Sequence, residues 1–319
     1  MTISVDAVDI VAAARNDPQT YARLEAELCN TDGTVPLHKR FRALFTLKSL
    51  ADAPAVDIID KAFVDPSALL KHELAYVLGQ MRNPHALICL ERVLRDQQED
   101  PMVRHEAAEA IGAISKEDSL PLLEEYAKDD SRVVRETCEL AIAKIKFEAK
   151  KAAGEESEDA SAYTSVDPAP PVPKKAEKST AQLREQLLDT TVSLFDRYRA
   201  MFALRNRGDV ESVLALAEGL NDDSALFRHE IAYVFGQMQH PASVPALIKS
   251  LTNTTEEGMV RHECAEALGS IATPEVFPVL KQFATDENIV VRDSCIVGLD
   301  MFEHETSGEF QYADGLTAH

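Results

Sequence analysis

The chain has 319 residues, of which 45% are hydrophobic, and its formal net charge at pH 7 is −21. This length suits one large domain or two smaller ones, and the hydrophobic share is ordinary for a globular core. The strong negative charge argues against a nucleic-acid partner, whose phosphates need a basic surface, and it favours a cationic partner.

Cysteine usage and hydropathy predict a cytoplasmic protein. The cysteines form no CxxC pattern and are odd in number, so we expect reduced thiols. The first residues, Met1 to Asp6, lack a basic region followed by an apolar one, so we expect no signal peptide. No stretch approaches the roughly 18 apolar residues of a membrane-spanning helix. The cysteines are Cys29, Cys89, Cys138, Cys264 and Cys295.

Helical periodicity begins in residues 6–28, where Pro18 is expected to separate two short helices. From residue 35 a regular unit recurs, in which Asp or Ser precedes the helix as the expected N-cap. The equivalent positions Phe41, His72, His105 and Glu136 are 31, 33 and 31 residues apart. Self-similarity at this period predicts an all-α fold, an α-solenoid in which each unit is a pair of antiparallel helices.

This pattern stops near residue 147 and then starts again. Residues 148–180 are acidic, rich in proline and without period, which predicts a flexible linker. Later motifs repeat earlier ones at an offset of 157, and residues 228–238 match residues 71–81 at eight of eleven positions. The sequence therefore predicts two pseudo-symmetric halves of about four repeats each, at 1–147 and 181–302, and a polar tail at 303–319.

Four His-Glu pairs occupy the central repeats of the two halves. The outer repeats carry other residues at the equivalent positions, so the scaffold itself does not need these pairs. Because equivalent positions of a solenoid share one face, the histidines of each half are expected on adjacent helices about 8–10 Å apart. The pairs are His72-Glu73, His105-Glu106, His229-Glu230 and His262-Glu263.

Two halves folded face to face would enclose four imidazoles and up to four carboxylates. This set suits two divalent first-row metals, and two histidines with one carboxylate are typical of non-haem Fe(II) sites. A dinuclear Zn or Mn hydrolase would use the same ligand types, and a non-catalytic adaptor would bind a partner on the concave face of the solenoid. The sequence contains no HExxH zinc motif, no ExxH motif of ferritin-like bundles and no phosphate-binding loop.

Other repeated residues around the pairs have structural interpretations. A basic residue before each histidine is expected to form ion pairs between repeats, and a glycine seven residues after it to allow close helix packing. A carboxylate one turn past the second histidine of each half either orients that imidazole or lies on the surface. In this order, the residues are Lys71, Arg104, Arg228 and Arg261, then Gly79, Gly112, Gly236 and Gly269, then Glu109 and Glu266.

Tandem repeats in two halves, with His-Glu pairs in two repeats of each, resemble the deoxyhypusine hydroxylase family, whose repeats are HEAT-like. The segments that carry the resemblance are residues 71–81, KHELAYVLGQM, and residues 103–107, VRHEA. The resemblance extends over nearly the whole chain outside the linker and the termini, and all four pairs are intact.

The resemblance implies a cytoplasmic di-iron monooxygenase, which we expect to be a monomer. It would hydroxylate the deoxyhypusine side chain of eukaryotic translation initiation factor 5A to hypusine, using two Fe2+ ions per chain, O2 and an external reductant. One iron would be held by His72, His105 and Glu106, and the other by His229, His262 and Glu263. Additional iron ligands or partners of the substrate amines would be Glu73 and Glu230, and the residues near the bound side chain would be Met259 and its counterpart Met102.

Overall fold

The computed structural model describes residues 11–307 and is built from helices and their connections, with no strand among these residues. This confirms the predicted all-α solenoid. No helix in the described range is long and apolar enough to cross a membrane. The structure divides into two compact units, which take up residues 11–114 and 115–307 of the described chain.

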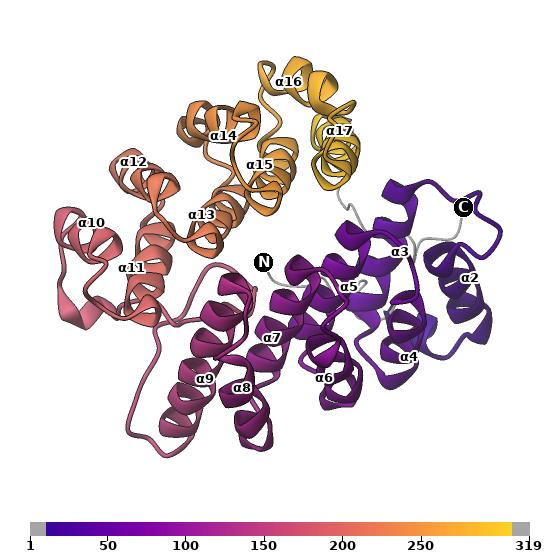
Figure 1. The fold of residues 1–319 in the computed structure, drawn as a ribbon, viewed down its shortest axis with the longest axis horizontal. Coiled ribbons are helices and arrows are strands. Elements are labelled where there is room, and N and C mark those ends of the chain that lie inside the picture. Colours follow the sequence, from indigo (N-terminus) through magenta and orange to yellow (C-terminus); the bar gives the residue numbers. More distant parts are fainter. Residues whose placement is uncertain (1–10, 308–319) are drawn as a thin grey trace. The chain divides into compact units, whose positions relative to one another are not determined.

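The first unit stacks its helices in two layers. One layer holds the successive neighbours α3, α5 and α7, and α4 and α6 lie in the other (Figure 1). Short connections between consecutive helices keep neighbours antiparallel, as expected for helical hairpins. The helices are α2 (Pro18–Cys29), α3 (Leu37–Leu50), α4 (Ala53–Ala62), α5 (Ala68–Met81), α6 (Leu87–Arg95) and α7 (Pro101–Ile114).

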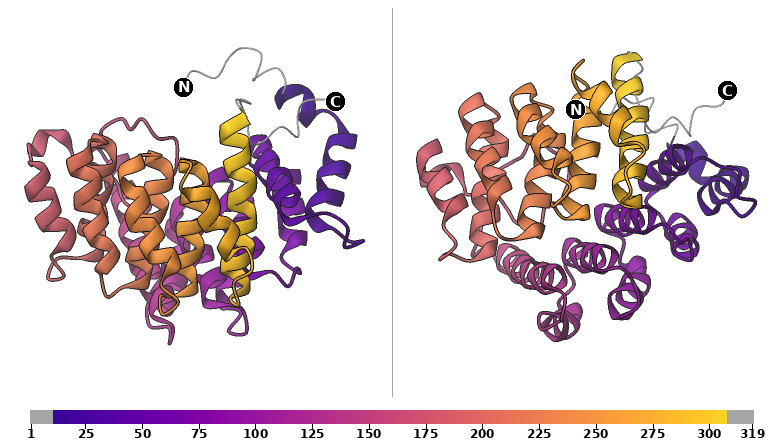
Figure 2. Two further views of the ribbon diagram at one scale, coloured as in Figure 1. Left: turned by 90° about the horizontal axis from the view of Figure 1, so that it is seen from above. Right: turned by 45° about the horizontal axis from the view of Figure 1, so that its top comes forward.

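The second unit repeats this plan over more helices. Its first layer runs through α9, α11, α13, α15 and α17, and α10, α12, α14 and α16 lie behind them (Figure 2). The helices are α8 (Leu120–Tyr126), α9 (Arg132–Ala152), α10 (Thr180–Leu188), α11 (Leu194–Arg207), α12 (Val210–Glu218), α13 (Ala225–Met238), α14 (Val244–Thr252), α15 (Gly258–Ile271), α16 (Val276–Phe283) and α17 (Ile289–Ser307). Short 3-10 turns are Pro84–Ala86, Glu117–Ser119, Lys174–Ala176, Gly219–Asn221 and Pro241–Ser243.

The compact units do not coincide with the predicted repeat halves at 1–147 and 181–302. Helices α8 and α9 come from the first half of the sequence, but α9 contacts α11 and α13. An ion pair and a hydrogen bond support this contact, since Arg132 Nη1 lies 2.7 Å from Asp223 Oδ2 and Ser224 Oγ donates to Glu136 Oε2 at 2.6 Å. Tertiary contacts therefore assign these helices to the second unit.

Helix starts repeat at the same offset as the motifs. Ser67 caps α5 and Ser224 caps α13, and each side chain accepts a hydrogen bond from the backbone N–H three residues later. Asp52 and Asp209 cap α4 and α12 in the same way. Such a cap satisfies one backbone donor that the first helical turn leaves open, so it marks where each helix begins.

Repeated glycines lie where first-layer helices approach most closely. A methyl group built on Gly269 would lie 2.5 Å from the Gly298 carbonyl oxygen, and one on Gly79 would lie 2.8 Å from Ala110 Cα. A real side chain does not fit at such distances, so α15 meets α17, and α5 meets α7, nearly backbone to backbone. The glycines thus allow the close packing expected from the sequence.

Basic residues before the histidines form ion pairs with acidic residues that precede a later helix of the same layer. Through these pairs Lys71, Arg228 and Arg261 join consecutive repeats, as expected for them. The nitrogen–oxygen distances are 2.5 Å for Lys71–Glu99, 2.6 Å for Arg228–Glu256 and 2.5 Å for Arg261–Asp286.

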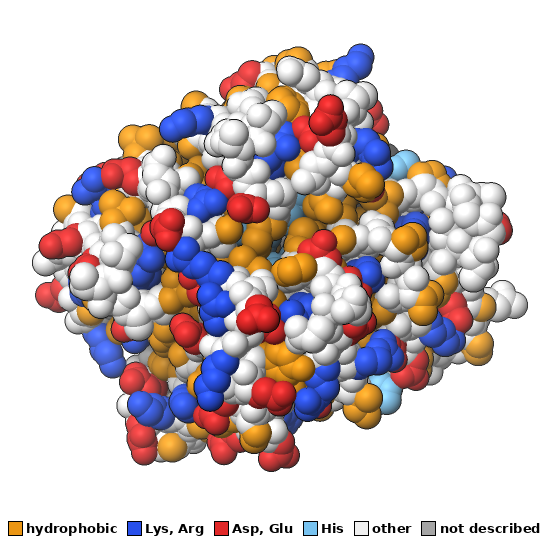
Figure 3. All heavy atoms as spheres, viewed as in Figure 1, with side chains coloured by type: hydrophobic (Ala, Val, Ile, Leu, Met, Phe, Trp, Pro, Cys, Tyr) orange, Lys and Arg blue, Asp and Glu red, His pale blue; other side chains and the backbone are white. Residues whose placement is uncertain are grey.

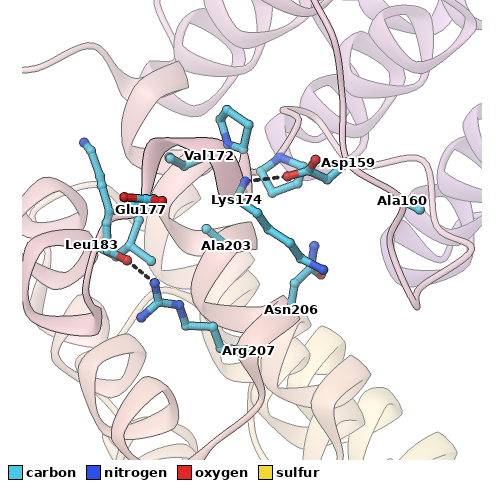
Figure 4. Close-up of a pocket in the computed structure, with 12 residues that line it drawn as sticks. Asp159, Ala160, Val172, Lys174, Glu177, Leu183, Ala203, Asn206 and Arg207 are labelled. Carbon is cyan, nitrogen blue, oxygen red and sulfur yellow. Dashed lines mark hydrogen bonds between the residues drawn. The ribbon is translucent and has the colours of Figure 1, made fainter.

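The predicted linker at 148–180 is only partly without regular structure. Helix α9 continues through Ala152, and α10 begins at Thr180. Residues 161–172, which we call the strap, lie against the second unit: Ala169 is fully buried, and Val172 N donates to Arg199 O at 3.0 Å. The end of the strap and the chain on either side of it border a pocket of about 260 Å³ beside α10 and α11, which Arg207 also lines (Figure 4). Arg207 donates a hydrogen bond to the Lys178 carbonyl.

At the ends of the described chain, the helix boundaries differ in detail from the prediction. Residues 11–15 are helical and α2 begins at Pro18, so Pro18 does separate two short helices. Residues 303–307, predicted as tail, form the last turn of α17. Residues 6–10 and 308–319 lie outside the described residues.

Candidate metal centre

The four His-Glu pairs lie on four first-layer helices. In the first unit, α5 carries His72 and α7 carries His105, and these helices pack against each other. In the second unit, α13 and α15 are likewise in contact and carry His229 and His262. Adjacent repeats in register therefore bring two pairs together in each unit, which is the arrangement that the repeat spacing predicts.

We call His72, Glu73, His105 and Glu106 the first cluster. All four side chains are buried, and His105 is 0% exposed. The rings of His72 and His105 have centroids 5.5 Å apart, and His72 Nε2 lies 3.3 Å from Glu106 Oε2. One ligand atom from each of these three residues lies within 4.8 Å of the other two. His72 Nδ1 faces Glu73 Oε1 at 3.3 Å, so Glu73 borders the same imidazole.

The pKa of His72 reports on this concentration of carboxylates. Burial alone lowers the pKa of the imidazole, because it penalises the charged form. The charge of Glu106 and hydrogen bonds to Glu106 and Glu73 outweigh burial, so the pKa of His72 lies well above its usual range. The carboxylates of the first cluster therefore favour positive charge at the His72 imidazole.

We call His229, Glu230, His262 and Glu263 the second cluster. It has the same construction: the imidazole centroids lie 5.3 Å apart, and His229 Nε2 lies 3.5 Å from Glu263 Oε2. His262 is 0% exposed and Glu230 is 3% exposed. Residues 157 positions apart in the sequence thus have equivalent geometry in the first and second clusters.

Glu266 is the carboxylate one turn past His262. Its Oε1 lies 3.5 Å from His262 Nδ1 and accepts a hydrogen bond from Ser294 Oγ at 2.9 Å. A carboxylate that is itself held by a hydroxyl can orient a neighbouring imidazole. Glu266 also belongs with His262 and Glu263 to a group of possible ligands whose atoms lie within 4.8 Å of one another. Glu266 thus lies beside the second cluster, with its side chain 14% exposed.

The methionines expected near the substrate lie just before the second histidine of each half. Met102 is 6% exposed at the start of α7, and Met259 is partly buried at the start of α15. Both positions are three residues from a cluster histidine on the same helix. Side chains three residues apart lie on one helical face, so each methionine lies on the face that carries His105 or His262.

The donor set of each cluster fits a divalent first-row metal. Two imidazoles and at least one carboxylate supply nitrogen and oxygen ligands of the types found in non-haem iron sites. Each cluster also buries two carboxylates beside imidazoles, and buried negative charge is costly unless a cation compensates it. The same donors accept Zn or Mn, so ligand chemistry alone does not decide which metal is bound.

Arg205, which was not among the predicted site residues, is fully buried and pairs with Asp167 of the strap at 2.7 Å. The repeat offers one signal, since the residue 157 positions earlier is Lys48. Arg205 reaches α13, the helix of His229, through a hydrogen bond to Gln237 Oε1 at 2.7 Å. This connection between the strap and α13 depends on tertiary contacts and cannot be read from spacing.

Comparison with known proteins agrees with this architecture. Models of HEAT repeats match residues 54–143 and 213–300, and a PBS lyase HEAT-like repeat matches residues 196–222. Deoxyhypusine hydroxylase of Drosophila pseudoobscura pseudoobscura is 55% identical over 282 residues, covering 88% of this chain and 92% of the relative. The Homo sapiens protein of the same name is 54% identical over 285 residues, covering 89% and 92%. The solved human deoxyhypusine hydroxylase in complex with glycerol has a TM-score of 0.85 at 51% identity, covering 92% of this chain and 98% of the other.

Fold and site together define a HEAT-repeat protein with two buried imidazole–carboxylate clusters suited to metal. Within that class, the identity over nearly the full length of these relatives is decisive. The chain belongs to the deoxyhypusine hydroxylase family. Membership confirms the resemblance drawn from the motifs, and it confirms the predicted enzyme class, an oxidoreductase that hydroxylates its substrate.

Proposed function

We propose that the chain hydroxylates the deoxyhypusine side chain of eukaryotic translation initiation factor 5A to hypusine. One C–H bond becomes C–OH, one atom of O2 enters the product, and the other leaves as water with two electrons and two protons from an external reductant. The observation that supports this proposal is the pair of buried clusters at equivalent repeat positions in a chain of this family.

We infer that each cluster holds one Fe2+ ion, so the chain binds two. His72, His105 and Glu106 would hold one, and His229, His262 and Glu263 the other. Bound iron would supply the oxidising power that side chains lack. That the two clusters face one another was expected from the sequence, and it stays a prediction.

The protein itself would bind and orient a long cationic side chain. Glu73 and Glu230 are 6% and 3% exposed, and they would either complete the iron ligation or accept hydrogen bonds from the substrate amines. Met102 and Met259 would contact its methylene groups, since thioethers adapt to a flexible apolar chain. Holding one methylene at a fixed place makes the reaction selective for one carbon.

Charge would assist substrate binding at long range. Acidic and basic side chains are interspersed on the face shown in Figure 3, where no single acidic patch dominates. The net charge of −21 therefore acts as a general field that attracts a cationic side chain. We further propose a cytoplasmic protein, because the five cysteines are all free thiols, as in a reducing compartment. The monomer expected from the sequence stays a prediction.

The test is to load the chain anaerobically with Fe(II), add the deoxyhypusine-bearing factor and admit O2 with a reductant. We expect mass spectrometry to find one added oxygen atom in the factor, and elemental analysis to find two irons per chain. His72→Ala should abolish the product, whereas His85→Ala, at an exposed histidine paired with Asp57, should not.

Two outcomes would contradict the proposal. Turnover that persists without O2 on Zn or Mn would indicate a hydrolase. Binding of the factor without hydroxylation, unchanged by His72→Ala and without copurifying metal, would indicate an adaptor.

A further inference from the structure

The strap is fixed to the second unit through the fully buried guanidinium of Arg205. Asp167 accepts from Arg205 Nη1 at 2.9 Å and from Nη2 at 2.7 Å, a bidentate pair. The guanidinium carbon lies 4.3 Å from the centroid of the Tyr163 ring, also in the strap. A paired and stacked guanidinium is rigid, and all its polar hydrogens are donors.

This rigidity determines the orientation of the Gln237 side chain on α13. Arg205 Nη1 donates to Gln237 Oε1 at 2.7 Å, and a guanidinium cannot accept, so the amide oxygen must face Arg205. On the other side, Gln237 Nε2 donates to Ser165 Oγ at 2.9 Å, and Ser165 Oγ donates to the Asp167 carboxylate at 2.6 Å. Arg205 and Ser165 therefore require the same orientation of the Gln237 amide. The oxygen and nitrogen atoms of such an amide are usually hard to tell apart.

The remaining hydrogen of this amide is donated to Tyr233. Gln237 Nε2 lies 2.9 Å from the Tyr233 hydroxyl oxygen, so that oxygen accepts and its own proton points to a different group. Side chains on a helix lean toward its N-terminus, so we expect Tyr233 to lie over the preceding turn, residues 229–232 of α13. Within that turn, Glu230 carries the one carboxylate.

We propose that Tyr233 is a positioning residue whose hydroxyl proton the strap directs toward the Glu230 carboxylate. The series of hydrogen bonds runs from Asp167 through Arg205 and Gln237 to Tyr233, and from Tyr233 it would reach the second cluster. A hydrogen bond from Tyr233 would hold Glu230 in one orientation for iron or for a substrate amine. The strap would thus act on the site by determining which group donates and which accepts in each of these hydrogen bonds.

The first half of the sequence differs at one member of this series. Tyr76 and Gln80 are the repeat equivalents of Tyr233 and Gln237, but Lys48 takes the place of Arg205. The Lys48 ammonium lies over the Tyr76 ring, 5.3 Å from its centroid. The two equivalent tyrosines therefore lie beside different basic side chains.

The direction of the hydrogen bond between residue 237 and Tyr233 can be reversed by a substitution that hardly changes the shape of the side chain. In Gln237→Glu the side chain becomes an acceptor for both Arg205 and Tyr233, so the hydroxyl proton turns away from Glu230. The matched control is Asn206→Asp, because Asn206 Oδ1 also accepts from Arg205, at 3.1 Å, and the change adds the same charge without touching Gln237. Tyr233→Phe removes the hydroxyl altogether.

Raman spectra of the metal-free chain report the polarity directly. Subtracting the Tyr233→Phe spectrum isolates the Fermi doublet of this tyrosine, whose intensity ratio distinguishes a hydroxyl that accepts from one that only donates. We expect the ratio to fall in Gln237→Glu and to stay unchanged in Asn206→Asp. An unchanged ratio in Gln237→Glu would overturn the proposal.

Iron retention against a competing chelator gives the second measurement, and it rests on the proposed function. We expect Gln237→Glu and Tyr233→Phe each to lower the affinity for one of the two irons about 10- to 100-fold. The double variant should bind that iron no more weakly than either single variant. Additive losses, or full retention in Tyr233→Phe, would refute the link to Glu230. If the wild-type chain bound no iron, the proposed function would fail, while the Raman result would still test the polarity of Tyr233.

Discussion

Replacing Gly269 by Ala tests whether the first-layer helices pack backbone to backbone. The new methyl group would lie 2.5 Å from the Gly298 carbonyl oxygen and 2.6 Å from its Cα, so α15 and α17 must move apart. Overpacking of this kind costs about 3 kcal/mol at the upper end of its usual range. The higher helix propensity of Ala offsets about 1 kcal/mol, which leaves a loss of about 2 kcal/mol.

Two other glycines of the same repeat position provide an internal scale. A methyl group on Gly79 would lie 2.8 Å from Ala110 Cα, and one on Gly236 would lie 3.3 Å from Ala267 Cα. The cost of crowding should fall as this distance grows. We therefore expect Gly79→Ala to be mildly destabilising and Gly236→Ala to be nearly neutral, because the gain in helix propensity offsets a slight shift.

The assay is thermal unfolding of the metal-free variants followed by circular dichroism, since bound metal would add its own stabilisation. A loss of about 2 kcal/mol should lower the Tm for Gly269→Ala by roughly 4–8 °C in a unit of this size. A Tm equal to that of the wild type would refute the reasoning, as would a larger loss in Gly236→Ala than in Gly269→Ala.

Three further predictions follow from the described contacts. Iron uptake by the metal-free chain should weaken as pH falls, because the carboxylates raise the pKa of His72 and a proton competes for the imidazole; Fe(II) titrations at several pH values, with proton release recorded, check this. Native thiol titration should show rapid reaction at Cys29 alone, since the other four cysteines are buried and burial raises the pKa of Cys295 to about 12; reaction of all five before unfolding would contradict it. Arg205→Met should cost about 3–5 kcal/mol in chemical unfolding, because Asp167 would keep a partly buried charge without its partner, and Asp167→Asn/Arg205→Met should recover part of that loss.

The sequence by itself determined the repeat and the residues that matter within it. Spacing placed His72 and His105 on equivalent turns of neighbouring helices, and the offset of 157 placed His229 and His262 likewise. Both follow from local rules, since helical period and repeat length are properties of contiguous segments. The expected Asp or Ser N-cap follows from the same kind of local rule, and Ser67 fills that place before α5.

Only the tertiary structure decided where the strap and α9 pack. Asp167 meets Arg205 across 38 positions of sequence, and Gln237 meets Ser165 across 72. No periodicity encodes such pairs, because the strap has no repeat and its composition resembles that of a solvated linker. Its order comes from one buried guanidinium that needs a carboxylate, and that requirement arises only after α11 and α13 have packed together.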